Sequence, residues 1–250
     1  MRFKFNKEIE FFLKKFLPQK FLYKKRIERS IKNKDENEIN LVKNLIRPGT
    51  DSIDVGVYRG VYSYEMSKYS NLVHSFEPNP IIFENISKNL SKILKNIKLY
   101  NFALSNKDEI IALKVPVRNR GYDKKNYEEY YQMGRATIHS TNEFKEYESF
   151  KVNSKRLDNI NFYNEISFIK IDVEGHEAEV IEGAKNIIKN FKPNLLVEIE
   201  EKHNKKKVST TIKFIESLGY NSFFYKNNEL KNTNNLDDLN LFNNYIFKSK

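Results

Sequence analysis

From residue 50 onward, short apolar strands alternate with helical segments, and no other feature constrains the fold as strongly. Strands are predicted where apolar residues cluster between turn signals, at 52–55, 72–76, 97–102, 168–172 and 195–200. Helices are predicted at 60–69, 80–94, 176–190 and 208–218, with a closing antiparallel pair at 221–225 and 244–248. Alternation with short connections produces a parallel sheet with helices on both faces and a ligand at the carboxyl ends of the strands. We therefore predict an α/β domain of the Rossmann-like class, with a mostly parallel seven-stranded sheet.

The segment Arg47-Pro48-Gly49-Thr50 separates a basic N-terminal part from this domain. Residues 1–47 hold 14 Lys and Arg against 6 Asp and Glu, and helices are expected at 9–17 and 35–46. We interpret them as a helical appendage to a domain at 48–250. Two roles stay open for the appendage: docking to an acidic membrane surface or partner, and packing on the domain as a solvated element. Because the first motif begins only at residue 53, deletion of residues 1–30 is expected to leave ligand binding intact.

A polar segment at 114–150 interrupts the alternation. It is rich in Tyr, Arg, Lys and Asn, and we predict an insertion that lies over the carboxyl ends of the strands. Arg135 and His139 are the candidates in this segment for contact with a substrate. Glu198, in the fifth strand, is a third candidate.

The composition excludes several classes of protein. The absence of Cys excludes disulfides, thiolate metal sites and a cysteine nucleophile. No apolar run reaches the roughly 20 residues of a membrane-spanning helix, and the first residues lack the pattern of a signal peptide. We therefore expect a cytoplasmic location.

Two groups of residues follow the first two strands. The first strand leads into Asp54, Gly56, Tyr58 and Gly60, whose glycines allow a close approach to a ligand and a sharp turn into a helix. Tyr58 replaces the second glycine of a dinucleotide-binding turn, which disfavours NAD. The second strand ends in Glu77, 21 residues after Gly56, where a carboxylate can accept both ribose hydroxyls of an adenosine.

A third group follows the fourth strand. Asp172, Glu174 and His176 lie within a short stretch directly after apolar residues. Burial of several acids is unfavourable unless each is paired or used, so a purely structural turn explains them poorly. If this strand lies beside the first, Asp172 and Glu174 face the same cleft as Asp54.

Five strings in this order resemble the FkbM family of methyltransferases, over about residues 50–200. They are Ile53-Asp54-Val55-Gly56 with Gly60, Phe76-Glu77-Pro78-Asn79-Pro80, Asn101-Phe102-Ala103-Leu104-Ser105, Arg156-Leu157-Asp158, and Ile169-Lys170-Ile171-Asp172-Val173-Glu174-Gly175. The resemblance implies a class I fold, S-adenosylmethionine as the methyl donor and, typically, O-methylation of small molecules or sugars. Tyr58 and His176 depart from the residues that are usual in the family, and both would reshape the acceptor side.

The resemblance also implies roles for individual residues. The first turn would hold the methionine end of the donor, Glu77 the ribose, and Asp172 would lie near the sulfonium, with Glu174 toward the acceptor. The residues expected to contact the donor are Asp54, Gly56, Tyr58, Gly60, Glu77, Pro78, Asn79, Asn101, Ala103 and Asp172.

For the reaction, we expect O-methylation of a hydroxyl, such as that of a saccharide in surface-glycan biosynthesis. The candidate general bases are Asp172, Glu174 and His176, because a hydroxyl acceptor must lose its proton. A divalent cation on the first two stays open, since Mg²⁺ favours oxygen ligands. Two other functions also stay open: RNA methylation, which the basic composition motivates but an acidic site disfavours, and a non-catalytic anchoring module of the same fold.

Overall fold

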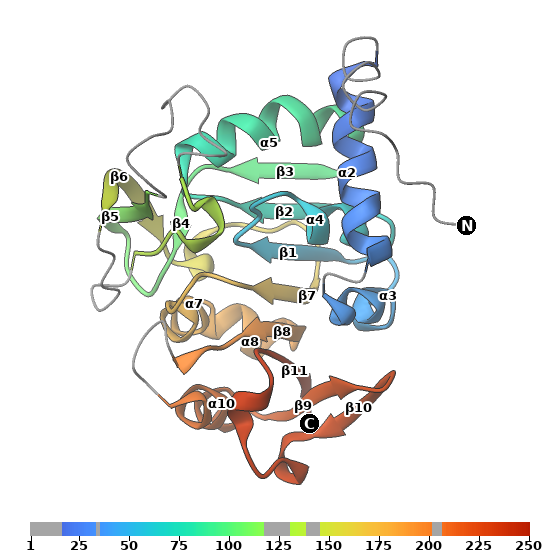
Figure 1. Cartoon of the computed structure of the whole chain (residues 1–250). Helices are drawn as coiled ribbons and strands as arrows, with labels where there is room; N and C mark the ends of the chain where they lie inside the picture. The colour runs from blue at the N-terminus through green and yellow to red at the C-terminus, as the bar shows by residue number, and fades with distance from the viewer. Residues whose placement is uncertain (1–16, 34–35, 118–130, 139–145, 202–206) are drawn as a thin grey trace.

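A computed structural model describes residues 17–33, 36–117, 131–138, 146–201 and 207–250. Its centre is an eight-stranded sheet with the order β10-β9-β11-β8-β7-β1-β2-β3 (Figure 1). The strands are β1 (Asp51–Val55), β2 (Val73–Phe76), β3 (Ile97–Tyr100), β7 (Ile166–Ile171), β8 (Asn194–Glu198), β9 (Tyr220–Lys226), β10 (Glu229–Asn232) and β11 (Asn244–Ser249). Five neighbouring strands, β3, β2, β1, β7 and β8, are parallel. Strand β11 is antiparallel to both of its neighbours, β8 and β9. The predicted fold class is confirmed, and β7 lies beside β1 as the motif required.

Helices cover both faces of this sheet. On one face, α7 (Glu177–Gly183), α8 (Lys185–Phe191) and α10 (Val208–Ser217) pack on apolar side chains of β1, β7, β8 and β11. The other face carries α2 (Gln19–Asn33), α3 (Val42–Leu45), α4 (Val61–Met66) and α5 (Pro80–Ile93), with a 3-10 turn at Asn37–Leu41 before α3. Helix α5 shows why these segments fold as they do. The side chain of Asn79 accepts hydrogen bonds from the first amides of α5, and Ile82, Ile86 and Leu90 form one buried stripe.

The structure differs from the sequence-based expectations in three elements. The sheet has an eighth strand, because the polar stretch after β9 folds back as β10. The expected helix at 176–190 is broken at Ala184 into α7 and α8. The ends of the expected insertion belong to strands, since β4 (Ala103–Leu104), β5 (Glu109–Pro116) and β6 (Tyr147–Lys155) form a second, three-stranded sheet. In β5 only Leu113 and Val115 alternate as buried residues before Pro116, which is too short a pattern to predict a strand.

Helix α2 connects the N-terminal region to the domain more closely than expected. The helix expected at 9–17 lies almost wholly outside the described residues, whereas α2 begins directly after Pro18 and packs on α4 and α5. Ile27 is 2% exposed in this contact, and the hydroxyl of Tyr23 donates to the carbonyl oxygen of Arg59 at 3.1 Å. Residues 19–33 therefore support the turn after β1. Deletion of residues 1–30 would remove most of α2, so we now expect this deletion to disturb ligand binding instead of leaving it intact.

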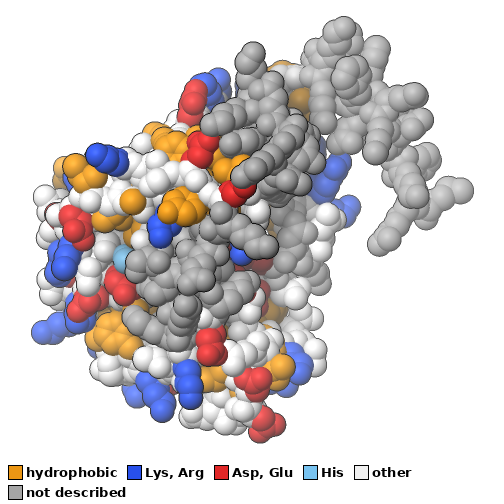
Figure 2. Space-filling model, turned by 60° about the vertical axis from the view of Figure 1, so that its left-hand side comes forward, with side chains coloured by type: hydrophobic (Ala, Val, Ile, Leu, Met, Phe, Trp, Pro, Cys, Tyr) orange, Lys and Arg blue, Asp and Glu red, His pale blue; other side chains and the backbone are white. Residues whose placement is uncertain are grey.

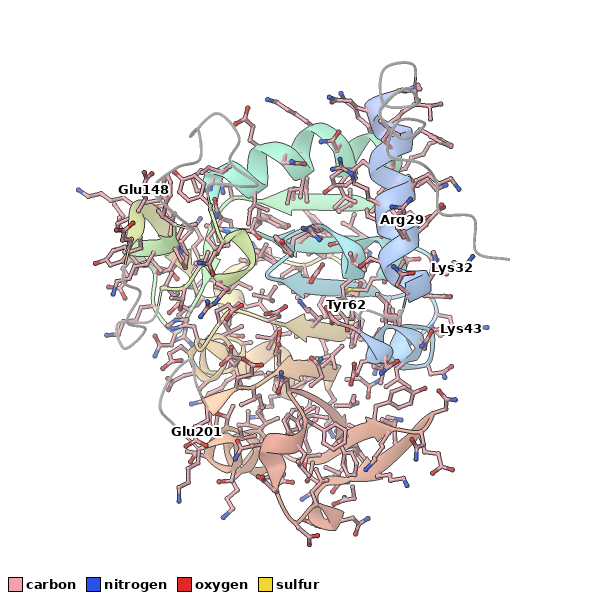
Figure 3. The ribbon with its side chains drawn as sticks, in the orientation of Figure 1. Arg29, Lys32, Lys43, Tyr62, Glu148 and Glu201 are labelled. Carbon is pink, nitrogen blue, oxygen red and sulfur yellow. The ribbon has the colours of Figure 1, made fainter. Side chains whose placement is uncertain are left out.

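Several charged side chains can be located relative to the two ends of the parallel strands. Arg29, Lys32 and Lys43 lie on α2 and α3, whereas Glu148 and Glu201 lie on the side of the carboxyl ends of the parallel strands (Figure 3). These three basic side chains thus lie away from the strand ends. Docking through residues 1–47 stays a prediction. None of the described helices combines the length and the apolar character needed to cross a membrane.

We predict that Ile27→Ala lowers the free energy of unfolding by about 2–4 kcal/mol, because it removes a buried side chain between α2 and α5. Urea unfolding monitored by circular dichroism measures this change. The matched control is Lys20→Ala on the exposed side of the same helix, which should change the stability by less than about 0.5 kcal/mol. Equal stability of the two variants would mean that α2 does not pack on the domain.

Candidate active site

A cleft opens at the carboxyl ends of β1, β2 and β7. It encloses about 680 Å³ of space, including open solvent at its mouth. Figure 2 brings this side of the molecule forward and shows acidic, basic and apolar side chains interspersed on its surface. The residues that line the cleft come from the strand ends, the second sheet and the 131–138 segment: Val55, Gly56, Tyr58, Phe76, Glu77, Pro78, Ile82, Phe102, Ala103, Leu104, Leu113, Gly134, Ala136, Ile138, Asp172, Val173 and Glu174.

The backbone of the turn after β1 packs in close contact with the backbone at the end of β7. Gly56 has a φ of +84°, and a Cβ atom there would lie 1.9 Å from the carbonyl oxygen of Asp172. Gly60 also has a positive φ, and a Cβ atom would meet the side chain of Leu90. Tyr58 adopts a φ of +48° between them, which is uncommon for a residue with a side chain. The first glycine is thus required by the contact between two strand ends as well as by any approach of a ligand.

Glu77 is held in a fixed orientation on the wall of the cleft. One carboxylate oxygen accepts the amide of Tyr58 at 3.0 Å, and the other accepts the amide of Asn79 at 2.9 Å. Burial raises the pKa of Glu77 to about 7, although the two amides oppose this shift. Glu77 is therefore a dry, oriented acceptor, as a residue that binds ribose hydroxyls must be.

Two candidates near Glu77, Asn79 and Asn101, support the backbone of the site and do not line the cleft. Asn79 is fully buried, and its side-chain oxygen caps α5. The side-chain nitrogen of Asn101 donates to the carbonyl oxygens of Glu77 and Pro78 at 2.9 and 3.3 Å. Both asparagines therefore shape the turn that carries Glu77, while Pro78 and Ala103 line the cleft directly.

Asp54 lies beneath the cleft, outside its lining. It is fully buried on β1, and its carboxylate accepts the hydroxyl of Ser63 at 2.5 Å. Burial raises the pKa of Asp54 to about 6, against the opposing effects of Lys170 and Ser63. Asp54 therefore acts on the site through the turn above it.

Acidic side chains meet at the ends of β7 and β8. The carboxylate of Asp172 lies 2.9 Å from the ammonium nitrogen of the buried Lys170. Glu198 follows Val197, the residue paired with Ile171, so it lies next to Asp172 across the strands. Burial, and then the charge of Asp172, raise the pKa of Glu198 to about 9, so Glu198 keeps its proton at neutral pH. The two acids thus form a pair in which one member is protonated.

Glu174 lies on the far side of this turn and lines the cleft. Its backbone has a φ of +54°, and its carbonyl oxygen accepts the hydroxyl of Thr137 at 2.8 Å. This bond ties the 131–138 segment to the end of β7. Strained backbone of this kind often occurs where a side chain must be aimed at a site.

Two further candidates, His176 and Arg135, lie outside the cleft lining. His176 precedes α7, where its Nε2 atom lies 2.9 Å from the hydroxyl of Ser105. Arg135 is exposed and donates to the side-chain oxygen of Gln132 at 3.1 Å, whereas its neighbours Gly134 and Ala136 line the cleft. His139 lies outside the described residues. In the described ranges, no three His, Asp or Glu residues are arranged to hold a metal ion.

Two features of the site were missed from the sequence. One is Lys170, which was assigned to an apolar strand; its charge in the middle of a buried strand was the available signal. The other is the contact between Gly134 and the ring of Tyr58, where a Cβ atom on Gly134 would lie 3.4 Å from the ring. The two residues are far apart in sequence, and no pattern in either segment indicates the contact.

We predict that Gly56→Ala destabilises the protein by at least about 2 kcal/mol more than Gly219→Ala. Both glycines have a positive φ, so each substitution should cost about 1–2 kcal/mol in backbone strain. Only at Gly56 does the new methyl group collide with backbone, whereas the space at Gly219 is open. Thermal and urea unfolding compare the two variants. Similar losses would contradict the close contact between the ends of β1 and β7.

We predict that Glu77 contributes a loss of stability as the pH rises from about 4.5 to about 7, and that Glu77→Gln removes this contribution from the measured slope. The pKa of Glu77 is raised in the folded state, so the unfolded chain releases this proton first and the stabilisation is lost across that window. Asp54 contributes in the same direction up to about pH 6. Urea unfolding at half-unit pH steps measures the slope. An unchanged slope in the folded variant would contradict the burial of the Glu77 carboxyl group.

Comparisons with known proteins place the chain in a family. The profile of the family described as methyltransferase FkbM domain matches residues 54–222. Among curated proteins, none matches the chain significantly. A solved structure of methyltransferase FkbM from Methylobacillus flagellatus KT is 13% identical with a TM-score of 0.51, over 84% of this chain and 50% of that chain. This chain thus spans about half the length of that protein.

Two further solved structures are similar at lower scores. Precorrin-6y C5,15-methyltransferase from Geobacter metallireducens GS-15 is 14% identical with a TM-score of 0.44, over 85% of this chain and 86% of that chain. An rRNA methylase from Streptococcus thermophilus is 10% identical with a TM-score of 0.46, over 85% and 93%. Because the family profile covers more than half of the sequence and includes all three strand-end motifs, the chain belongs to the methyltransferase FkbM domain family.

Proposed function

We propose that the chain transfers a methyl group from S-adenosylmethionine to a hydroxyl oxygen of a saccharide or related small molecule, in a pathway such as surface-glycan biosynthesis. The observation that carries the proposal is the pair of acids, Asp172 and Glu174, on the wall of the cleft that also holds Glu77. Acids at this position suit a cationic donor and an acceptor that must lose a proton.

The cleft fits the donor by shape and chemistry. Glu77 offers oriented carboxylate oxygens for the ribose hydroxyls, and Ile82 and Phe102 supply an apolar wall for a flat adenine ring. When bound, S-adenosylmethionine supplies a methyl group that its sulfonium already activates. The residues of the cleft therefore need mainly to align acceptor and donor, which can contribute on the order of 7–11 kcal/mol.

Glu174 is the general base in this proposal. The ammonium group of Lys170 stabilises the charged form of Asp172, which makes Asp172 a weak proton acceptor. Glu198 already carries its proton at neutral pH. His176 bonds to Ser105 and lies outside the cleft lining. We therefore assign proton removal from the acceptor to Glu174 and stabilisation of the cationic donor to Asp172.

Aromatic and basic side chains at the mouth support a sugar-containing acceptor. The ring of Tyr58 is 39% exposed, with the guanidinium carbon of Arg59 5.0 Å from its centroid and Gly134 beside it. Arg135, next to Gly134, is also exposed. Tyrosine faces stack on sugar rings, and arginines bind phosphate or carboxylate groups. A nucleotide-linked or otherwise anionic saccharide therefore fits this mouth.

The test is incubation of the protein with labelled S-adenosylmethionine and separate pools of sugar nucleotides, glycolipids, RNA and protein. Label should enter the saccharide pools. Glu174→Gln should lower kcat by about 10²–10⁴ while donor binding is kept, whereas the matched variant His176→Gln should retain activity within about tenfold. Arg135→Ala should raise KM for the acceptor. Label in RNA or protein alone would exclude the saccharide, and a greater loss in His176→Gln would move the base to that residue.

A further inference from the structure

A row of polar side chains crosses the middle of the parallel sheet. Ser75 on β2, Asp54 on β1 and Lys170 on β7 are paired in register, and their exposed fractions are 0%, 0% and 4%. Interior strands of parallel sheets are usually apolar on both faces. Since none of the three residues lines the cleft, contact with a ligand does not explain the row.

Lys170 makes the contacts that connect this row to the cleft. Its ammonium nitrogen lies 2.9 Å from the carboxylate of Asp172 and donates to the carbonyl oxygen of Gly56 at 3.3 Å. The same nitrogen lies 5.0 Å from the ring centroid of Tyr62, which α4 places against this face of the sheet (Figure 3). The buried ammonium group of Lys170 therefore contacts both the turn after β1 and the end of β7.

The surroundings of Lys170 are strongly acidic. Burial disfavours its charge, but Asp172, Asp54 and Glu36 together outweigh this effect and hold the pKa of Lys170 above its usual value. Glu198 approaches from β8, and α4 contributes Tyr62 and Ser63 to the same cluster. The side chain of Asp172 is 29% exposed toward the cleft, and on its inner side the ammonium group of Lys170 is the cation that stabilises its charge.

We propose that Lys170 is a positioning residue of the donor site, which fixes the Gly56 turn against Asp172 and keeps the Asp172 carboxylate ionised beneath the donor. Lys170 acts through these two groups, without touching the cleft itself. The inference rests on the donor site of the proposed function and is independent of the acceptor. Its test therefore uses ligand binding and folding, so that a wrong acceptor would leave the result unchanged.

The first experiment is titration calorimetry with S-adenosylhomocysteine from pH 6 to pH 9. Lys170→Met should weaken binding relative to the wild type, and this loss should be at least about tenfold larger at pH 6 than at pH 9, because the acids take up protons more readily without the cation. Lys170→Arg should keep the wild-type pH profile. Ser75→Ala, a control in the same buried row, should shift no pH midpoint. An equal loss at every pH, or an altered profile in a folded Lys170→Arg protein, would overturn the proposal.

The second experiment measures urea unfolding without ligand, and it decides the matter if Lys170→Met folds poorly. The double variant with Lys170→Met and Asp54→Asn removes the cation together with the charge of Asp54, its buried register partner on β1, so it should be more stable than Lys170→Met alone at pH 8. The difference between the two variants should shrink toward pH 5, where Asp54 is protonated in the Lys170→Met protein and is then as neutral as the asparagine of the double variant. If the second substitution only adds to the loss, the role of Lys170 is packing alone and the proposal fails.

Discussion

The structure depends on how the sheet holds several buried or half-buried carboxyl groups together at the carboxyl ends of its parallel strands. Removal of a carboxylate from water disfavours its charged form, so each acid at this edge needs its own compensation. Glu77 accepts two backbone amides, Asp172 contacts the ammonium group of Lys170, and Glu198 keeps its proton. The three solutions differ because three different strands end there. Together they place an oriented acid and a charged acid on the wall of the cleft and a neutral acid beside them at the end of β8.

The backbone around these acids is fixed by contacts from three directions. The Gly56 turn touches the backbone of Asp172 from within the sheet, and Tyr23 on α2 bonds to the carbonyl oxygen of Arg59 from outside. On the opposite side, Thr137 bonds to the carbonyl oxygen of Glu174. Such support is what a site needs if its side chains are to be aimed to within a fraction of an ångström. The N-terminal helix is thus part of the scaffold of the site, although the sequence presents it as an appendage.

The sequence predicted the sheet because strands such as 52–55 and 168–172 are short apolar runs between clear turn signals. It also predicted that Asp172 and Glu77 share one edge, since the carboxyl ends of neighbouring parallel strands must meet there. It did not predict β5 and β6, whose buried positions are few and lie among Lys and Glu. The sequence also did not show that Asp54 lies outside the cleft wall. Polar and apolar residues alternate along a strand only when one face is exposed, and β1 is buried on both faces, so its sequence does not reveal which face Asp54 takes.

The positions of the charged side chains around the cleft bear on which ligands the cleft can bind. Acidic groups gather at the carboxyl ends of the strands, whereas Arg29, Lys32 and Lys43 lie on α2 and α3, away from that edge (Figure 3). In the proposed function, the three acids on the cleft wall, Glu77, Asp172 and Glu174, attract the cationic donor. Arg59 and Arg135 are exposed beside the rim of the same cleft, near Tyr58 and Gly134. Under the proposal made above, an acceptor with one compact anionic group contacts these arginines while its hydroxyl reaches the acids below, and for this reason we favour a small charged saccharide as the acceptor over a nucleic-acid strand.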